Sequence, residues 1–277
     1  MLRSFVAFAL KRKDRHVCAE TAVAWSAKAK GQMQRHKRLR VVTRFAEYLR
    51  AENPRHEIPP QHVFHPHAHR PSPHIFSDED IRHIVGGAAR LGSPGSLQGK
   101  MYSTFFGLLA TTGLRFSEAA CLRFSDITPD GLIIRQTKFR KSRVVPMHPT
   151  TWAALERYLV DRHRIGADDF VFITQRRTRP SHGVALGTFR AVCDRAGVGR
   201  CPSGARPRIH DLRHTFAVRA LERSPVGRDR VERHIVALTT YLGHARIEST
   251  YWYLERTPRL LKDIAAACEA VVAGAQP

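Results

Sequence analysis

The sequence lacks any apolar run long enough to cross a membrane. No stretch reaches the roughly eighteen consecutive apolar residues that a spanning helix needs. A secretory signal is also missing, because the apolar residues of MLRSFVAFALKRKDR precede the charged ones, in the reverse of the usual order. These absences predict a cytoplasmic protein that does not span a membrane.

Cysteine is scarce, and no two cysteines form a CxxC motif. Two classes that need closely spaced cysteines, disulfide-stabilised domains and zinc ribbons, are therefore disfavoured. We expect reduced thiols that act mostly in packing at the five positions, which are Cys18, Cys121, Cys193, Cys201 and Cys268.

Acidic residues are few, with 24 Asp and Glu against 46 Lys and Arg, and the formal net charge is +22. Such an excess repels itself unless a polyanion or an anionic surface neutralises it. DNA, RNA and an anionic membrane surface all satisfy this requirement, because charge alone reports counterion release and not base or sugar recognition.

The length of the chain and its N-terminal pattern predict two domains. A typical domain has about 150 residues, and the chain has 277. Residues 33–51 form a basic amphipathic helix pattern. Its apolar stripe comprises Val41, Val42, Phe45, Tyr48 and Leu49. With shorter helical segments near residues 2–12 and 20–30, this helix predicts a small helical N-terminal unit.

A segment rich in proline and histidine follows this unit. Its prolines, at positions 54, 59, 60, 66, 71 and 73, remove backbone donors and exclude long helices. Residues 53–76 are therefore predicted to form a linker. Histidines stand at positions 56, 62, 65, 67, 69 and 74, so a metal site is the alternative. Because these histidines have no cysteine partners, solvated linker residues are favoured.

Residues 77–277 show the pattern of a mainly α domain with a small antiparallel β-sheet, an α+β fold. Ser77 and Asp80 form a capping box at the start of a helix, and a buried helix ends at Gly113. Two β-rich runs, 132–136 and 143–147, are separated by the basic segment TKFRKS and predict a hairpin. Further helices are expected near residues 149–164, 184–196, 211–223, 229–242 and 259–273.

Two short segments carry charged residues that a simple helical domain does not need. Arg115 follows the helix end at residues 112–114, and Glu118 lies three residues further on, where it can orient the guanidinium. His210 and Arg213 are three residues apart, so they share a face if a helix begins there. Two converging arginines could bind phosphate oxygens and stabilise the negative charge of a pentacoordinate phosphate.

Further along, LGHARIESTYWYLE places His244 next to a helix end and Tyr253 nine residues later. With these motifs in this order, the sequence resembles the tyrosine recombinase (phage integrase) family over about residues 77–265. The TGLRxSE motif of the family matches residues 112–118, and its HxLRHT box matches residues 210–215. Its LGH box supplies His244.

The hairpin motif of the family, GKxxKxRxVP, matches residues 137–146 and includes Lys138, with Thr137 in place of the leading glycine. Each motif alone has a simpler explanation. A TGLR tetrapeptide can be a helix end, HDLRH can be a helix start, and a Tyr-Trp-Tyr cluster is more often core than catalytic. Their occurrence together and in the family order favours the resemblance.

The resemblance implies three segments: a short helical core-binding, DNA-binding domain at residues 1–52, a Pro/His-rich linker at 53–76, and a catalytic domain with a C-terminal helix at 77–277. It also implies a site-specific DNA recombinase or integrase. Such an enzyme would cleave and rejoin DNA strands through a 3′-phosphotyrosyl intermediate, for a mobile element or for phage integration and excision.

The resemblance also implies a catalytic role for each motif residue. Tyr253 would be the nucleophile, and His210 would take its proton, because a phenol with a pKa of about 10 is a poor nucleophile at neutral pH. Lys138 would protonate the leaving 5′ oxygen. No metal or cofactor is required. The scissile phosphate would be held by Arg115, Arg213 and His244. Tyr251 is the alternative nucleophile, but the spacing of the family favours Tyr253.

The implied partner is double-stranded DNA, bound by a homotetramer on paired sites, with accessory or sister recombinases as further partners. An apolar helix face could dock on a neighbouring protomer or could equally close its own domain. It comprises Leu260, Leu261, Ile264, Ala267, Cys268 and Val271. Two rival functions are a type IB topoisomerase, which shares the chemistry, and a catalytically silent DNA-binding regulator. The regulator is disfavoured because all six catalytic positions are filled by the family's residues.

Overall fold

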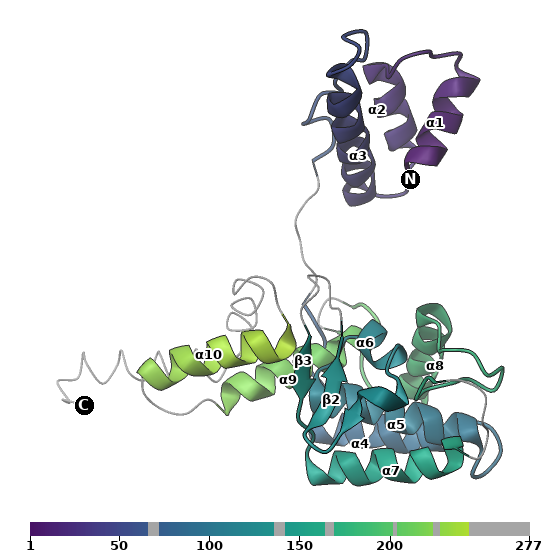
Figure 1. Cartoon of the computed structure of the whole chain (residues 1–277). Coiled ribbons are helices and arrows are strands. Elements are labelled where there is room, and N and C mark those ends of the chain that lie inside the picture. Colours follow the sequence, from purple (N-terminus) through teal and green to yellow (C-terminus); the bar gives the residue numbers. More distant parts are fainter. Residues whose placement is uncertain (66–71, 136–141, 164–168, 202–203, 224–227, 244–277) are drawn as a thin grey trace. The chain divides into compact units, whose positions relative to one another are not determined.

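The computed structural model of the chain divides into two compact units, Met1–Pro71 and Ser72–Pro277. It describes residues 1–65, 72–135, 142–163, 169–201, 204–223 and 228–243 (Figure 1). No helix within those ranges has both the length and the apolar character that crossing a membrane requires.

Three helices form the first unit, namely α1 (Leu2–Lys11), α2 (Ala19–Ala27) and α3 (Gln32–Arg50). They pack around a core that includes Phe5, Trp25 and Leu39. The rings of Phe5 and Trp25 meet edge to face with their centroids 5.5 Å apart. The three helices predicted for this part of the chain are confirmed.

One residue of the apolar stripe predicted on α3 faces solvent. Tyr48 is 68% exposed, whereas Val42 is fully buried. The buried apolar positions of this helix are Leu39, Val42 and Ala46, which recur every three or four residues. Tyr48 lies to one side of that series, so the buried face of the helix does not include this residue of the predicted stripe.

The first part of the Pro/His-rich segment packs against the helical unit. Val17 N donates to Nδ1 of His56 at 3.0 Å, and Glu57 N donates to Val17 O at 2.8 Å. Phe64 is buried in the core of this unit. His56 is therefore a hydrogen-bond acceptor within the fold, and the expectation of a solvated histidine is wrong at this position. The division between the units, after Pro71, falls inside the segment predicted as a linker.

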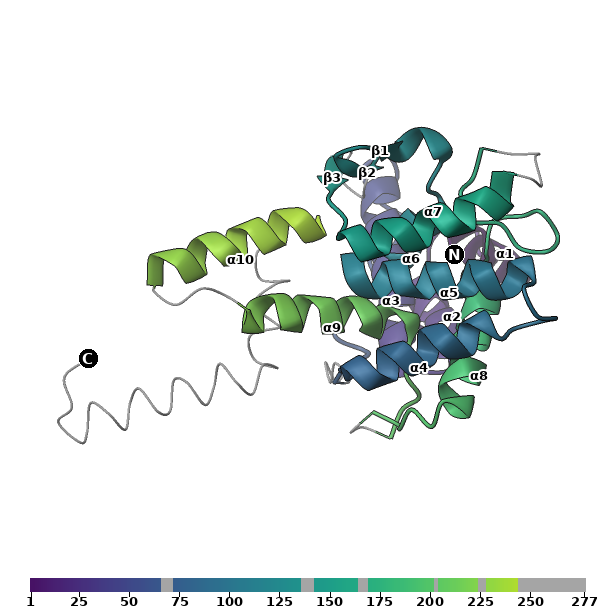
Figure 2. The ribbon, with the colours of Figure 1, turned by 90° about the horizontal axis from the view of Figure 1, so that it is seen from below.

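The second unit is built around α5 (Leu97–Thr112). Three long helices pack against α5, and one more packs against the first of these (Figure 1, Figure 2). They are α4 (Asp78–Ala89), α7 (Pro149–His163) and α9 (Ile209–Glu222), followed by α8 (His182–Arg195) on α4. Aromatic rings fill the core between them: Phe105 meets Phe172 with centroids 5.0 Å apart, and Phe106 meets Phe189 at 5.1 Å.

Capping residues begin α4 and end α5 where the sequence predicts. Ser77 Oγ accepts from Asp80 N at 3.0 Å, and Asp80 Oδ2 accepts from Ser77 N at 2.8 Å, which completes a capping box. α5 ends at Gly113, whose φ of 61° is left-handed. A Cβ there would lie 2.5 Å from Cδ1 of Phe216, so both the conformation and the space favour glycine.

The predicted hairpin is formed by β2 (Gly131–Ile134) and β3 (Arg143–Val145), which pair antiparallel with Ile134 opposite Arg143. A third antiparallel strand, β1 (Ile127–Thr128), pairs with β2; two residues are too few for a periodic pattern to predict. Residues 136–141, the basic tip, lie outside the described residues. The helices with this small sheet confirm the predicted fold class.

Two short elements and a last helix complete the described part of this unit. α6 (Phe116–Ala120) and the 3-10 turn η1 (Phe124–Asp126) connect α5 to the sheet. α10 (Arg228–Leu242) packs beside α9 through buried apolar side chains (Figure 2). The rings of Phe216 and Tyr241 stack across this contact with centroids 5.4 Å apart. The helix predicted near residues 259–273 lies outside the described residues.

We expect Gly113→Ala to lower the free energy of unfolding more than Gly197→Ala does. Both glycines have left-handed φ angles, 61° and 68°, and such angles cost other L residues about 1 kcal/mol or more. The added Cβ would also meet Phe216 at Gly113, whereas nothing lies within 4 Å at Gly197. Urea unfolding followed by circular dichroism measures both losses. Equal losses would show that the ring of Phe216 moves aside without cost.

Candidate active site

Arg115 stands directly before α6, where its backbone is fixed on both sides. Leu114, the preceding residue, is 1% exposed and anchors the chain in the core. Arg115 N donates to Oε2 of Glu118 at 2.9 Å, and Arg115 Nη1 donates to Oε1 of Glu118 at 2.8 Å. The prediction that Glu118 orients the guanidinium of Arg115 is confirmed.

His210 and Arg213 lie near the start of α9, as its second and fifth residues. An ion pair between the buried Asp211 and the partly exposed Arg208 caps the start of this helix. Asp211 accepts hydrogen bonds from the backbone N and from Nη2 of Arg208, both at 2.8 Å, and its carboxylate has no exposed surface. The rings of His210 and His214 meet edge to face with centroids 4.6 Å apart. The helix start therefore holds His210 and Arg213 in a fixed relation.

The side chain of Arg213 is 2% exposed and links three segments of the chain. Its Nη1 donates to Gly113 O at 2.7 Å, and its Nη2 donates to Leu242 O at 2.6 Å. These charge-assisted hydrogen bonds offset part of the cost of removing a guanidinium from water. Arg213 thus ties the start of α9 to the turn before Arg115 and to the end of α10.

Three arginines converge on the last carbonyls of α10. Nε of Arg143 donates to the carbonyl oxygen of Tyr241 at 2.7 Å. Nη2 of Arg213 donates to that of Leu242 at 2.6 Å, and Nη2 of Arg115 donates to that of Gly243 at 2.9 Å. The C-terminus of a helix carries partial negative charge, which favours cations there. Arg115 and Arg213 come from separate motifs and are brought to one place.

Arg143 is the arginine of the GKxxKxRxVP hairpin motif, and it neighbours this site without having been assigned a catalytic role. From β3 it donates Nη1 to Oε1 of Glu118 at 3.1 Å and Nη2 to Oε2 at 2.8 Å. Burial alone would raise the pKa of Glu118, but hydrogen bonds and charges from Arg143 and Arg115 outweigh it and hold that pKa below its ordinary value. The signal in the sequence is the hairpin motif at residues 137–146, whose arginine falls at this position.

The imidazole of His210 is neutral at pH 7. Desolvation by the surrounding protein has the largest effect on its pKa, followed by the positive charge of Arg213, and together they lower the pKa from 6.5 to about 4. The negative charge of Asp211 opposes this change and is outweighed. Among the described residues His210 is exposed to solvent, so a proton donor can reach the neutral ring.

Three of the predicted site residues lie outside the described residues. They are Lys138, between β2 and β3 in the sequence, and His244 and Tyr253, beyond the end of α10. Tyr251 and the apolar helix face within residues 260–271 also lie outside them. Their parts in the site remain predictions.

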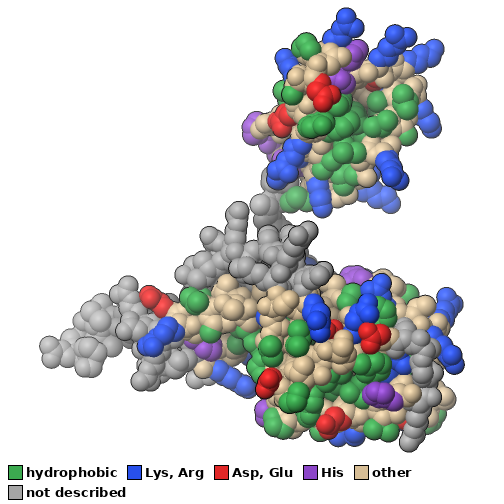
Figure 3. Space-filling view, in the orientation of Figure 1, with side chains coloured by type: hydrophobic (Ala, Val, Ile, Leu, Met, Phe, Trp, Pro, Cys, Tyr) green, Lys and Arg blue, Asp and Glu red, His purple; other side chains and the backbone are tan. Residues whose placement is uncertain are grey.

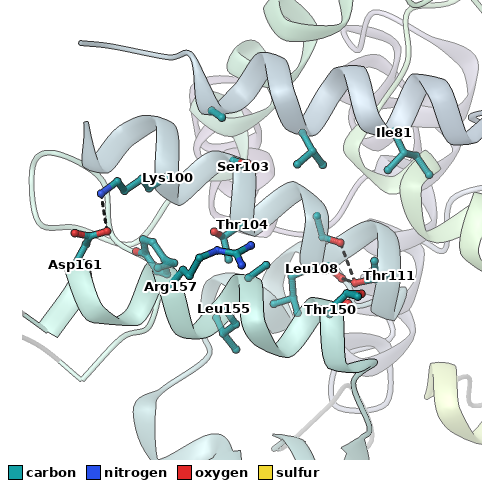
Figure 4. Close-up of a pocket in the computed structure, with 16 residues that line it drawn as sticks. Ile81, Lys100, Ser103, Thr104, Leu108, Thr111, Thr150, Leu155, Arg157 and Asp161 are labelled. Atoms are coloured by element: carbon teal, nitrogen blue, oxygen red, sulfur yellow. Dashed lines mark hydrogen bonds and ion pairs between the residues drawn. The ribbon is translucent and has the colours of Figure 1, made fainter. Parts of the chain in front are cut away.

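A cavity of about 490 Å³ opens beside Arg115 and Glu118 and is also lined by Arg123. Its lining also includes Arg135 and Asp126, so arginines and carboxylates both face this cavity. A separate cavity of about 570 Å³ lies between α4, α5 and α7 (Figure 4) and contains none of the predicted site residues. At its edge, Nζ of Lys100 contacts Oδ2 of Asp161 at 2.7 Å.

Residues 76–259 match the sequence profile of the phage integrase family. A putative integrase/recombinase of Sinorhizobium fredii, y4rB, is 35% identical over 273 residues, which are 95% of this chain and 87% of the relative. Tyrosine recombinase XerD of Mycobacterium leprae is 32% identical over 65% of this chain and 55% of its own length.

Solved structures share the fold. XerA recombinase matches with a TM-score of 0.57 and 21% identity, over 96% of this chain and 88% of that one. XerH site-specific recombinase, bound to its palindromic difH substrate, matches with a TM-score of 0.68 and 17% identity, over 91% and 71%. The profile match and the identity with y4rB show that this chain belongs to the phage integrase family and is an enzyme of the tyrosine recombinase type.

Proposed function

We propose that the chain is a site-specific DNA recombinase or integrase that cleaves and rejoins strands through a 3′-phosphotyrosyl intermediate. The observation that carries the proposal is the convergence of Arg115 and Arg213 on the end of α10, beside the neutral His210. Relatives of the same fold support a DNA substrate, since a lambda integrase dimer is solved bound to a core site and the Tn1549 transposon integrase is solved with transposon end DNA. Integration or excision of a mobile element or phage fits this chemistry.

Arg115 and Arg213 would bind the nonbridging oxygens of the scissile phosphate. A guanidinium has five N–H donors, and the contacts of the Arg115 guanidinium with described residues use Nη1 and Nη2 once each. Donors therefore remain for a phosphate. Negative charge on the nonbridging oxygens rises as the pentacoordinate transition state forms, so fixed cations stabilise that state more than the ground state.

Tyr253 would attack the phosphorus. A bond forms between the phenol oxygen and phosphorus while the bond from phosphorus to the 5′ oxygen breaks, which leaves a 3′-phosphotyrosyl link and a free 5′ hydroxyl. The neutral imidazole of His210 would accept the phenol proton. Lys138 would donate a proton to the departing 5′ oxygen, and His244 would donate a hydrogen bond to the phosphate.

Rejoining would run the same steps in reverse with a different strand. A 5′ hydroxyl of that strand attacks the phosphotyrosyl link, restores a phosphodiester and releases the tyrosine, which takes back a proton. One bond between phosphorus and oxygen replaces another at each stage, so no ATP is consumed. Side chains of this chain carry every proton transfer, and the scheme uses no metal or cofactor.

Double-stranded DNA is the proposed partner, bound by a homotetramer on paired sites. Lys and Arg side chains are spread over the visible surface of both units, with few acidic side chains among them (Figure 3), and the chain carries a net charge of +22. Release of counterions from the DNA phosphates would drive binding and make it weaken as salt is added. The apolar face within residues 260–271 is the proposed contact between protomers, and accessory or sister recombinases are further proposed partners.

We expect Tyr253→Phe to abolish covalent attachment to DNA and to leave DNA binding unchanged. The nucleophilic oxygen is removed, but no basic group is lost. The test incubates the protein with a nicked suicide substrate carrying a candidate site from the DNA that flanks the gene, and maps the adduct by denaturing electrophoresis and peptide analysis. Tyr251→Phe is the matched control and should still react. Attachment retained in Tyr253→Phe and lost in Tyr251→Phe would make Tyr251 the nucleophile.

Recombination between two sites should require both sites in one reaction. A plasmid with two copies of the site should yield exchanged products, because strand transfer needs a 5′ hydroxyl from a second duplex. The same preparation is assayed for relaxation of a supercoiled plasmid without a second site. Efficient relaxation by a monomer together with no exchanged product would instead indicate a type IB topoisomerase.

His210 should titrate near pH 4 in the free protein. Because its pKa is lowered, the ring stays neutral and able to accept a proton as the pH falls through 6.5, where an ordinary histidine is half protonated. The C2 proton resonance of His210, assigned by its absence in the spectrum of His210→Gln, measures this pKa. A midpoint at or above 6.5 would contradict the effect assigned to desolvation and to Arg213.

A further inference from the structure

Arg143 joins three parts of the active-site region. Its side chain is 11% exposed and lies between β3, α6 and the end of α10. Nη1 and Nη2 donate to the two carboxylate oxygens of Glu118 at 3.1 and 2.8 Å, and Nε donates to Tyr241 O at 2.7 Å. Glu118 in turn holds Arg115. Arg143 is therefore one contact away from a residue that would bind the scissile phosphate.

The shape of the guanidinium explains why an arginine occupies this position. Its planar fork matches the two oxygens of Glu118, and its Nε is left to reach a third acceptor in a fixed direction. A lysine keeps the charge but offers a single nitrogen without this planar geometry. The carboxylate of Glu118 is 8% exposed, so little water is present to replace a missing donor.

Arg143 also stands at the base of the hairpin. Strand pairing places it opposite Ile134, at the last paired position before the segment that contains Lys138 in the sequence. A shift of Arg143 would therefore move the stem from which that segment departs. The side chain of Arg143 thus connects the stem to the end of α10 directly and to Arg115 through Glu118.

The end of α10 is shaped to fit the same guanidinium. Gly243 has a left-handed φ of 63°. A Cβ at this position would lie 2.8 Å from Nη1 of Arg143, so the chain leaves α10 in close contact with the guanidinium. His244 is the next residue, and Tyr253 follows nine residues later.

We propose that Arg143 is a positioning residue for strand cleavage, which fixes the stem of the Lys138 hairpin, the Arg115–Glu118 pair and the end of α10 in one arrangement. Arg143 touches no reacting atom. It sets the relative positions of the hairpin stem, the proposed phosphate-binding arginine and the end of α10, and the proposed general acid and nucleophile follow the stem and α10 in the sequence. The inference rests on the proposed function, because these roles belong to it.

The test is Arg143→Lys, measured by the rate of covalent adduct formation on the suicide substrate at saturating DNA. A displacement of about 1 Å can slow an enzymatic step by roughly 100-fold, and we expect a loss of that order in the cleavage rate with an unchanged Kd for DNA. A second substrate carries sulfur in place of the leaving 5′ oxygen. A thiolate leaves without a proton donor, so this substrate should recover part of the lost rate.

Arg162→Lys is the matched control, because Arg162 is also buried and also donates to a backbone carbonyl, that of Phe170, at 2.9 Å. It should lower thermal stability and leave the cleavage rate of the folded protein and the effect of sulfur unchanged. Equal cleavage rates in Arg143→Lys and the wild type would overturn the inference. So would a loss confined to Kd, or a slow reaction that sulfur does not improve.

A second variant serves if Arg143→Lys does not fold. Gly243→Ala keeps every charge, but the added Cβ pushes against Nη1 of Arg143, so this variant should also slow cleavage. Gly197→Ala is its control, because Gly197 has a similar φ and open space around it, and it should not slow cleavage. A wild-type protein that forms no adduct would refute the proposed function, and this inference with it. A reactive wild type with equally reactive Arg143→Lys and Gly243→Ala would refute the inference alone.

Discussion

The carboxylate of Glu118, buried between two guanidinium groups, is the interaction on which the rest of the site depends. Removing a carboxylate from water costs several kcal/mol, and attraction to nearby cations offsets this only when its oxygens are well hydrogen-bonded. Both oxygens of Glu118 accept from Arg115 and from Arg143. The pair of arginines would repel each other without it. Glu118 therefore allows two cations to stand side by side next to the end of a helix.

Two left-handed glycines bring the backbone into reach of the arginines. Gly113 ends α5 and its carbonyl accepts from Arg213, while the carbonyl of Gly243, after α10, accepts from Arg115. Arg213 thus binds the turn just before Arg115, and both arginines donate to carbonyls at the end of α10. Left-handed φ angles come readily only to glycine. Glycine at these two turns therefore lets the backbone place the carbonyl oxygens that accept from Arg213 and Arg115.

The sequence predicts those features of the fold that depend on local patterns. Capping at Ser77, the helix end at Gly113 and the hairpin with Arg143 each involve residues close together in the chain, and each is found. The strand β1 escapes prediction because two residues show no periodicity. The contacts of Arg143 escape it for another reason: Glu118 is 25 residues away and Tyr241 is 98 residues away, so tertiary packing alone brings them together. His56 and Val17, 39 residues apart, are a further case.

The charges around the end of α10 do not cancel. Arg115, Arg143 and Arg213 contribute three positive charges and Glu118 one negative charge, while His210 is neutral, so this group of described residues has a surplus of two. A phosphodiester has one negative charge, and the pentacoordinate species formed from it by a phenolate has two. In the proposed reaction His210 takes the proton of the phenol, so the surplus of this group would rise from two to three while the charge on the phosphate changes from one negative charge to two. The pull of this group on the phosphate grows as the bond to the leaving oxygen lengthens.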